Sequence, residues 1–328
     1  MKKLKNFWQL LKEAGAGFSR HKVLKLSASL AYYTIFSIGP MLLVVIFFSD
    51  LFWGRDAIEG RLYGQLGGMV GNNAAHKIQE IIRNASVSGT SFSAIIGFVT
   101  LIIAATTAFI EMQDSINTIW NLRVRKNTGW KLMLKNRLMS FSIVAGLGFL
   151  LLVSLVVNTL LEGFMDKIQE MFPQVAVVVV YVFNLLLTLA VVTCLFGIIF
   201  KVLPDALIRW KDVAAGAFFT AVLFMIGKFG ITFYISKTDP GSTYGTAGSL
   251  VVLLLWIYYS SAILYFGAEF TKAYAMKYGS EIRPDTYAVT VQVVNLESEE
   301  GSVQANEKNA VETEKEVQKA KDMKKKTG

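Results

Sequence analysis

The sequence predicts an all-α, polytopic membrane protein with six transmembrane helices. Five apolar stretches carry almost no charge, and a sixth is interrupted only by Lys228. Each is close to the roughly 20 apolar residues that a helix needs to cross ~30 Å of hydrocarbon. The chain is also 53% hydrophobic and only 17% charged, whereas charged residues make up about 25% of soluble domains. The predicted spans are 26–49, 92–112, 138–161, 175–200, 213–236 and 246–268.

The distribution of basic residues orients these spans. Lys and Arg gather before span one, between spans two and three and after span four, whereas the loops after spans three and five hold only Lys167 and Lys237. Because short loops rich in Lys and Arg stay on the cytoplasmic side, we expect both termini in the cytoplasm. Topology and attraction to anionic headgroups then explain the net charge of +9, and we expect no nucleic-acid partner.

The N-terminal half contains three further local features. Residues 1–25 predict a cytoplasmic amphipathic lead-in, in which aromatic side chains alternate with lysines. The first span is predicted to break near Pro40, because proline lacks a backbone donor and disturbs the preceding turn. The long first external loop contains apolar residues at helical spacing over residues 74–85, which predicts an amphipathic helix there.

The chain after the last span changes character. Residues 26–270 are predicted to form the transmembrane domain, and residues 271–328 a cytoplasmic tail. Weak alternation over 286–295 indicates a short extended piece. From about residue 297 the chain is polar and rich in Glu, Lys and Gln, a composition that predicts disorder.

Ionisable side chains at membrane depth are costly and are therefore candidate functional groups. Glu111 and Asp114 share one helical face near the predicted cytoplasmic boundary, where Glu269 also lies. They either pair with nearby basic residues or form an acidic cluster at the inner mouth of a cavity. Lys228 lies a few ångströms below the outer edge of its span. It either extends outward to water or binds an anionic headgroup or substrate.

Polar and aromatic residues also interrupt the first and last spans. Trp256 and Tyr259 lie near the predicted midplane, where an indole or a hydroxyl needs a partner. A partly polar sixth span facing the broken first span is the best candidate for a cavity wall. The candidate path or substrate contacts are Tyr33, Ser37, Pro40, Glu111, Asp114, Lys228, Trp256, Tyr259 and Glu269.

Several classes of activity are excluded by what the sequence lacks. It has no phosphate-binding G-x-x-x-x-G-K-[ST] loop and no H-E-x-x-H or G-x-S-x-G motif. Cys194 is the only cysteine, and the two histidines, His21 and His76, fall in separate loops. We therefore expect no catalytic residues, no cofactor and no metal, and a protein that is not an enzyme.

Three segments resemble the YihY/virulence factor BrkB family of bacterial inner-membrane proteins. These are the first-span run 29–40, the loop residues 203–205 with 210–217, and the last-span residues 244–270. The resemblance implies six helices in the bacterial plasma membrane. It also implies that the older label ribonuclease BN is an error, and it points to envelope biogenesis. The family supplies no agreed catalytic residues.

The leading interpretation is movement of a lipid or other amphiphile across the membrane or between its leaflets. It rests on the broken first span, the polar sixth span and Lys228, together with the lack of a nucleotide motor. The alternative is a non-transporting membrane scaffold for envelope assembly. Membrane lipids are the expected partners, and the sequence leaves a homo-oligomer or envelope-assembly partners open.

Overall fold

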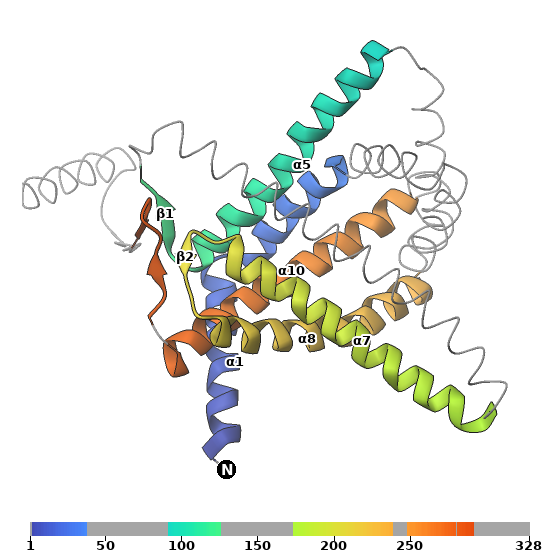
Figure 1. Ribbon diagram of the computed structural model, residues 1–328, viewed down its shortest axis with the longest axis vertical. Helices are drawn as coiled ribbons and strands as arrows, with labels where there is room; N and C mark the ends of the chain where they lie inside the picture. The colour runs from blue at the N-terminus through green and yellow to red at the C-terminus, as the bar shows by residue number, and fades with distance from the viewer. Residues whose placement is uncertain (1, 38–90, 126–172, 239–247, 280, 292–328) are drawn as a thin grey trace, which may run out of the picture. The chain divides into compact units, whose positions relative to one another are not determined.

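The computed structural model describes residues 2–37, 91–125, 173–238, 248–279 and 281–291 (Figure 1). The long helices are α1 (Lys2–Arg20), α5 (Ser91–Ile119), α7 (Pro173–Val202), α8 (Trp210–Thr238) and α10 (Gly248–Tyr278). Residues 23–37 are also helical. Four short strands accompany them: β1 (Leu122–Val124), β2 (Ala206–Leu207), β3 (Arg283–Pro284) and β4 (Ala288–Thr290). All of these elements belong to one structural unit that ends at Thr290.

Three of the described helices are long and apolar enough to cross a membrane, over Leu185–Val202, Trp210–Ile235 and Leu250–Tyr278. They correspond to the fourth, fifth and sixth predicted spans. The helix over 23–37 covers the start of the first predicted span. The predicted third span, the break near Pro40, the external amphipathic helix and the tail from residue 297 lie outside the described residues.

Helices α8 and α10 pack antiparallel through a reciprocal pair of glycines and threonines. A Cβ atom added at Gly216 would lie 2.7 Å from Cβ of Thr271, and one added at Gly267 would lie 2.9 Å from Cβ of Thr220. Each threonine hydroxyl donates to a carbonyl of its own helix, Thr220 to Gly216 and Thr271 to Gly267, both at 2.7 Å. Small residues with internally satisfied hydroxyls allow two helix backbones to approach closely within a membrane.

Helix α1 lies along α10 in the opposite direction. Its apolar face is buried, with Leu10 and Ala14 packed against Phe270 and Ala273. Near its start, Lys277 Nζ of α10 donates to Gln9 Oε1 at 2.7 Å. The spacing of apolar residues that predicted an amphipathic lead-in therefore forms a helix that packs on protein along this face.

Lys22 marks the change of direction after α1. Its φ of 51° lies in the left-handed region, which side chains other than glycine rarely adopt. The amides of Lys25 and Leu26 bond back to the Lys22 carbonyl, so the next helix begins at once. A two-residue turn thus separates α1 from the helix over residues 23–37.

The short strands gather three separate segments at one end of the helices, which we call the strand-paired end. β4 pairs antiparallel with β1, with Leu122 opposite Thr290, and β3 pairs with β2, with Ala206 opposite Pro284. The chain after α10 therefore joins the segments that follow α5 and α7. The all-α class predicted from the sequence did not include these two ladders, although an extended piece was expected within 286–295.

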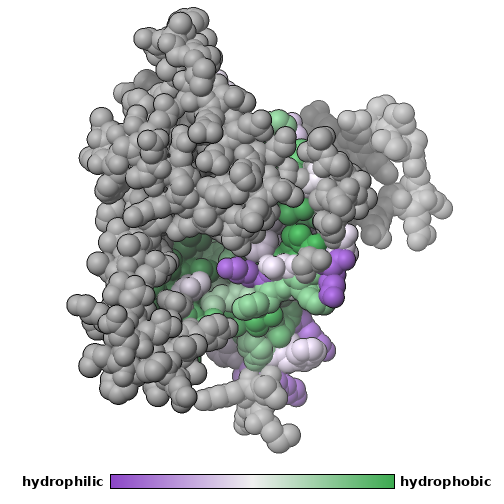
Figure 2. All heavy atoms as spheres, turned by 90° about the vertical axis from the view of Figure 1, so that its right-hand side faces the viewer, coloured by the Kyte–Doolittle hydropathy of each residue, from purple (hydrophilic) through white to green (hydrophobic). Residues whose placement is uncertain are grey.

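The main apolar core lies toward this end as well. It contains Ile116 and Ile119 of α5, Phe200 of α7, Val213 of α8 and Tyr265 of α10, all fully buried. Elsewhere large apolar side chains on the helices are exposed, among them Leu186, Ile226, Phe229, Phe233 and Leu250. Hydrophobic residues cover much of the described surface in Figure 2. This distribution suits helices whose outer surface meets lipid chains.

Candidate functional site

The most extensively hydrogen-bonded side chain described is Asp205, in the turn between α7 and α8. Its carboxylate is buried, at 2% exposure, and accepts hydrogen bonds from Gln113 Nε2 at 2.8 Å, Asn117 Nδ2 at 2.7 Å and Tyr287 OH at 2.9 Å. Its own amide donates to Asn117 Oδ1 at 2.9 Å. Because three donors satisfy the charge, it can remain buried.

Asp205 connects the same three segments that the strands join. Gln113 and Asn117 come from α5, and Tyr287 comes from the segment after α10. The carbonyl of Asp205 also accepts from the amide of Asp285 at 3.1 Å. In the sequence, residues 203–205 stand out only as part of a family motif, and no periodicity or spacing indicates that Asp205 binds three partners.

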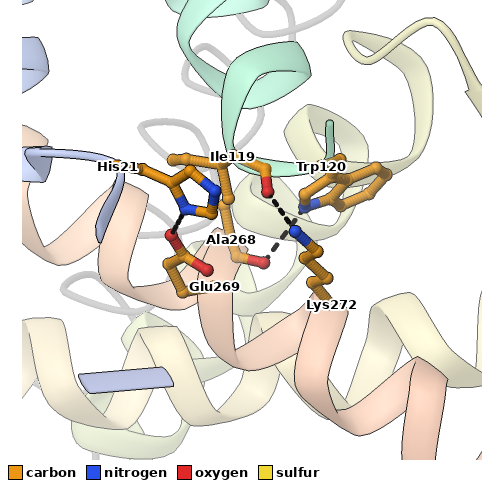
Figure 3. A network of polar contacts seen from close by, with 6 residues as sticks. All are labelled: His21, Ile119, Trp120, Ala268, Glu269 and Lys272. Carbon is orange, nitrogen blue, oxygen red and sulfur yellow. Dashed lines mark hydrogen bonds and ion pairs between the residues drawn. The ribbon is translucent and has the colours of Figure 1, made fainter. Parts of the chain in front are cut away.

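A second polar network joins α10 to α1 and α5 (Figure 3). His21 Nδ1 lies 2.5 Å from Glu269 Oε1, forming an ion pair when the imidazole is protonated. Lys272 Nζ donates to the carbonyl of Ile119 at 2.6 Å, and Trp120 Nε1 donates to the carbonyl of Ala268 at 3.1 Å. The lysine thus places a positive charge at the C-terminus of α5, where a helix dipole favours it.

The second network explains why α10 runs ten residues beyond the predicted end of span six. In the sequence, Glu269 and Lys272 mark the end of the apolar stretch. In the structure, both charges have partners on neighbouring elements, and α10 continues to Tyr278. From the sequence, His21 was predicted to be a loop residue without a special role in binding metal. Its pairing with Glu269 depends on a contact between residues far apart in the chain, and no local pattern could indicate it.

The acidic residues of α5 lie beside the Asp205 network. Glu111 is half-buried and Asp114 is exposed. Asp114 follows the predicted end of span two. Although Asp114 is exposed, neighbouring protein still removes part of the water around its carboxylate, which raises its pKa above the ordinary value, and the negative charges of Glu111 and Asp205 raise the pKa further. The acids on this part of α5 therefore lie close enough to repel one another.

The remaining candidate residues lie in other places. Ser37 is buried and its hydroxyl donates to the carbonyl of Thr34 at 2.8 Å, so its own helix satisfies it. The ring of Tyr33, which is half-buried, contacts the ring of Tyr32 at 5.4 Å between centroids. Pro40 lies outside the described residues.

Trp256 and Tyr259 contact α8. Trp256 is buried and meets Phe224 edge to face, with 6.5 Å between ring centroids. The hydroxyl of Tyr259 lies against Gly227, next to Lys228, which is exposed on α8. Gly227 leaves room for the tyrosine ring. The wall facing the first span, on which the sequence predicts these two aromatic residues, stays a prediction, because that span is described only to Ser37.

No chemistry of catalysis is apparent in these networks. The described residues include no group of three or more His, Cys, Asp or Glu side chains placed to hold a metal ion. The carboxylates of Asp205 and Glu269 are engaged by donors within the protein. What the arrangement does is fix the ends of α1, α5, α7, α8 and α10 against one another.

Long apolar helices with exposed apolar side chains, joined at one end by a buried polar network, define an α-helical membrane protein. Residues 14–289 match the virulence factor BrkB family. Because this match covers most of the chain, the protein belongs to that family. The family predicted from the sequence is confirmed.

Individual relatives carry the name UPF0761 membrane protein. The one from Ralstonia nicotianae is 28% identical over 249 residues, which cover 74% of this chain but only 54% of that protein. The one from Tolumonas auensis is 28% identical over 75% of this chain and 78% of its own length. The one from Haemophilus influenzae is 25% identical over 81% of this chain and 94% of its own length. These names state a membrane location and no activity. No solved structure matches the chain.

Proposed function

We propose that this protein moves a lipid or other amphiphile across the bacterial plasma membrane, or between its leaflets, during envelope biogenesis. It is a membrane protein with no motif for nucleotide hydrolysis in its sequence, so the movement is passive or driven by a gradient. Membrane lipids are its partners, and it is not a ribonuclease.

The observation that carries this proposal is the position of Lys228. This cation is exposed on α8 within the apolar window Trp210–Ile235, and its neighbours Ile226 and Phe229 are exposed as well. A lysine among apolar side chains at membrane depth is costly unless it reaches water or meets an anion. The headgroup of an anionic amphiphile supplies that charge while its chains contact the surrounding apolar surface.

The strand-paired end supports an orientation with both termini in the cytoplasm. The segments around β1, β2 and β3–β4 follow the second, fourth and sixth predicted spans, and lie together at one end of the helices. A chain that crosses the membrane with each span places these three segments on the same side. Their excess of Lys and Arg makes that side the cytoplasmic one.

Reconstitution into vesicles tests the proposal. Purified full-length protein is incorporated with fluorescent anionic or zwitterionic lipids, and movement between leaflets is followed by quenching from outside. We expect Lys228→Gln to slow movement of the anionic lipid about tenfold, as loss of ~1.4 kcal/mol of binding would, and to leave the zwitterionic lipid unchanged. Vesicles that move lipid no faster than protein-free vesicles would refute the proposal.

Two matched variants test whether the slower movement of anionic lipid is specific to Lys228. Lys237→Gln removes an exposed lysine from the end of the same helix, and we expect it to behave as wild type. Glu111→Gln removes a charge near the strand-paired end, and we expect a smaller loss than for Lys228→Gln. The reverse order would move the argument from an anionic lipid to a coupling cation bound at the acids of α5.

The alternative is a scaffold for envelope assembly that transports nothing. The buried Asp205 network favours this alternative, because its hydrogen bonds hold three segments together at one end of the helices. Under this alternative, reconstituted protein moves no lipid, and the Lys228→Gln variant restores growth to a strain that lacks the protein as well as wild type does.

A further inference from the structure

Glu269 is a buried carboxylate at the junction of α10 with α1. Its residue exposure is 3%, and its closest partner is His21 Nδ1, at 2.5 Å. His21 directly follows α1, and Lys22 with its positive φ comes next. The pair therefore lies where α1 ends and the chain turns into the next helix (Figure 3).

Gly17 provides the space for this carboxylate. A Cβ atom at Gly17 would lie 2.7 Å from Cδ of Glu269, well inside the ~3.5–4.0 Å at which carbon atoms meet. The carboxylate is thus seated directly against the backbone of α1. Any change in its charge acts on the contact between the two helices.

Three cations act on Glu269, and they differ in how they respond to pH. His21 and Arg20 belong to the α1 side, and Lys272 comes from α10 itself. Lys272 Nζ also donates to the Ile119 carbonyl, so its charge is shared with the end of α5. Imidazole is the only one of these three groups that ordinarily changes charge between about pH 5 and 8.

We propose that the His21–Glu269 pair is a proton-binding site, and that release of its proton loosens the contact of α1 with α10. With the proton bound, an imidazolium compensates the buried carboxylate. When the proton leaves from Nε2 to water, Nδ1–H can still donate, but the carboxylate has lost its nearest positive charge. A buried carboxylate without sufficient compensation is strongly destabilised, and separation of α1 from α10 returns it to water.

A second contact between the same helices does not depend on this proton. Lys277 Nζ donates to Gln9 Oε1 and to the Asn6 carbonyl near the start of α1. The rings of Phe7 and Phe270 also meet there, at 6.1 Å between centroids. Proton release therefore acts at the end of α1 next to the turn at Lys22, while the opposite end keeps its contacts. The effect of this proton on the contact between α1 and α10 does not require that the protein move a lipid.

Distances between spin labels test the proposal on the full chain in detergent micelles. Cys194 is replaced by serine, and labels are attached at Ser19→Cys, at the end of α1 that the proposal loosens, and at Met276→Cys on α10, both exposed positions. Double electron–electron resonance then gives the distribution of distances. Between about pH 6 and about pH 8.5 we expect a longer-distance population to rise about tenfold, as a ~1.4 kcal/mol change produces. An unchanged wild-type distribution over this range overturns the proposal.

Variants of His21 and Glu269 test whether this pair causes the change in distance with pH. His21→Gln should show the longer-distance population at both pH values, because it never carries the proton. Glu269→Gln should show the short distance at both, because no buried charge remains. Loss of the pH response in His21→Gln supports the proposal, and an undiminished response there overturns it.

Two controls distinguish an effect of the His21–Glu269 pair from a general loosening of the helix packing. Lys277→Gln removes the other polar contact of α1 and should keep the pH response, because the His21–Glu269 pair is intact. Labels at Lys211→Cys and Met276→Cys join α8 to α10 and should report one distance at both pH values. A pH response of the α8–α10 pair equal to that of the α1–α10 pair would also overturn the proposal.

Discussion

Alanine in place of Gly216 should force α8 and α10 apart. The new Cβ would lie 2.7 Å from Cβ of Thr271, about 1 Å closer than two carbon atoms normally approach. No rotamer of Thr271 relieves this overlap, because the position of Cβ is set by the backbone. The threonine side chain is fully buried, so the helices themselves must move.

The magnitude follows from two opposing effects. Overpacking a buried interface costs about 1–3 kcal/mol. The upper end of that range applies here, because the helix backbone must shift. Alanine gains about 1 kcal/mol over glycine in a helix. We therefore expect Gly216→Ala to lower the free energy of unfolding by about 1–2 kcal/mol, measured by denaturant unfolding of the protein in mild detergent.

A double substitution and a control make this prediction specific. Thr271→Gly removes the clashing Cβ, so Gly216→Ala should cost less in that background than in wild type, and the double-mutant cycle should show favourable coupling. Gly230 lies on the same helix with nothing within 4 Å of an added Cβ, so Gly230→Ala should stabilise. If Gly216→Ala stabilises as much as Gly230→Ala, the described α8–α10 packing is wrong.

Three further predictions concern the strand-paired end and the turn after α1. Asp205→Ala should lower thermal stability in detergent by the equivalent of about 3–5 kcal/mol, because buried Asn117 and half-buried Gln113 and Tyr287 lose their acceptor, whereas Tyr287→Phe should cost about 1 kcal/mol. Asp114→Asn should stabilise the protein at neutral pH, because a raised pKa penalises the charged carboxylate in the folded state. That advantage should shrink as the pH falls through the raised pKa toward the ordinary value of 3.8, and an advantage that grows in acid would contradict it. Lys22→Gly should raise the unfolding midpoint, since glycine adopts a φ of 51° without strain, and a lower midpoint would show that the lysine side chain matters more.

The sequence predicted the apolar helices well because their signal is local. The fourth, fifth and sixth predicted spans fall within α7, α8 and α10 apart from two residues at the start of the sixth, and each helix extends beyond the predicted C-terminal end. A charged residue ends an apolar stretch of sequence, but the helix can continue past it where another part of the fold compensates the charge. Glu269 and Lys272 have such partners: His21, in the turn that follows α1, and the carbonyl of Ile119 at the end of α5.

Most of the strand-paired end was beyond sequence reasoning for a related reason. Only β4 lies in a segment, 286–295, whose alternation indicated extended chain. The other strands have two or three residues, too few to show a period, and Asp205 has the sequence context of an ordinary turn residue after a proline. Its three donors come from segments far apart in the chain. Of the candidate site residues, Glu269 proved to have a specific polar partner, whereas Ser37 bonds within its own helix and Trp256 packs as a core residue.

The order of the strand pairs has a consequence for how the protein is made. A ribosome completes β1 and β2 long before their partners β3 and β4, which follow α10. Until residues 283–290 emerge, the segments after α5 and α7 have no strand to pair with, and Asp205 lacks the hydroxyl of Tyr287. Insertion of the helices can proceed during synthesis, but closure of this end must wait until the last helix has been completed. In a chain interrupted before Arg283, the ends of the inserted helices would stay exposed to water and to proteases. Proteases can therefore degrade interrupted chains faster than chains that have reached Thr290.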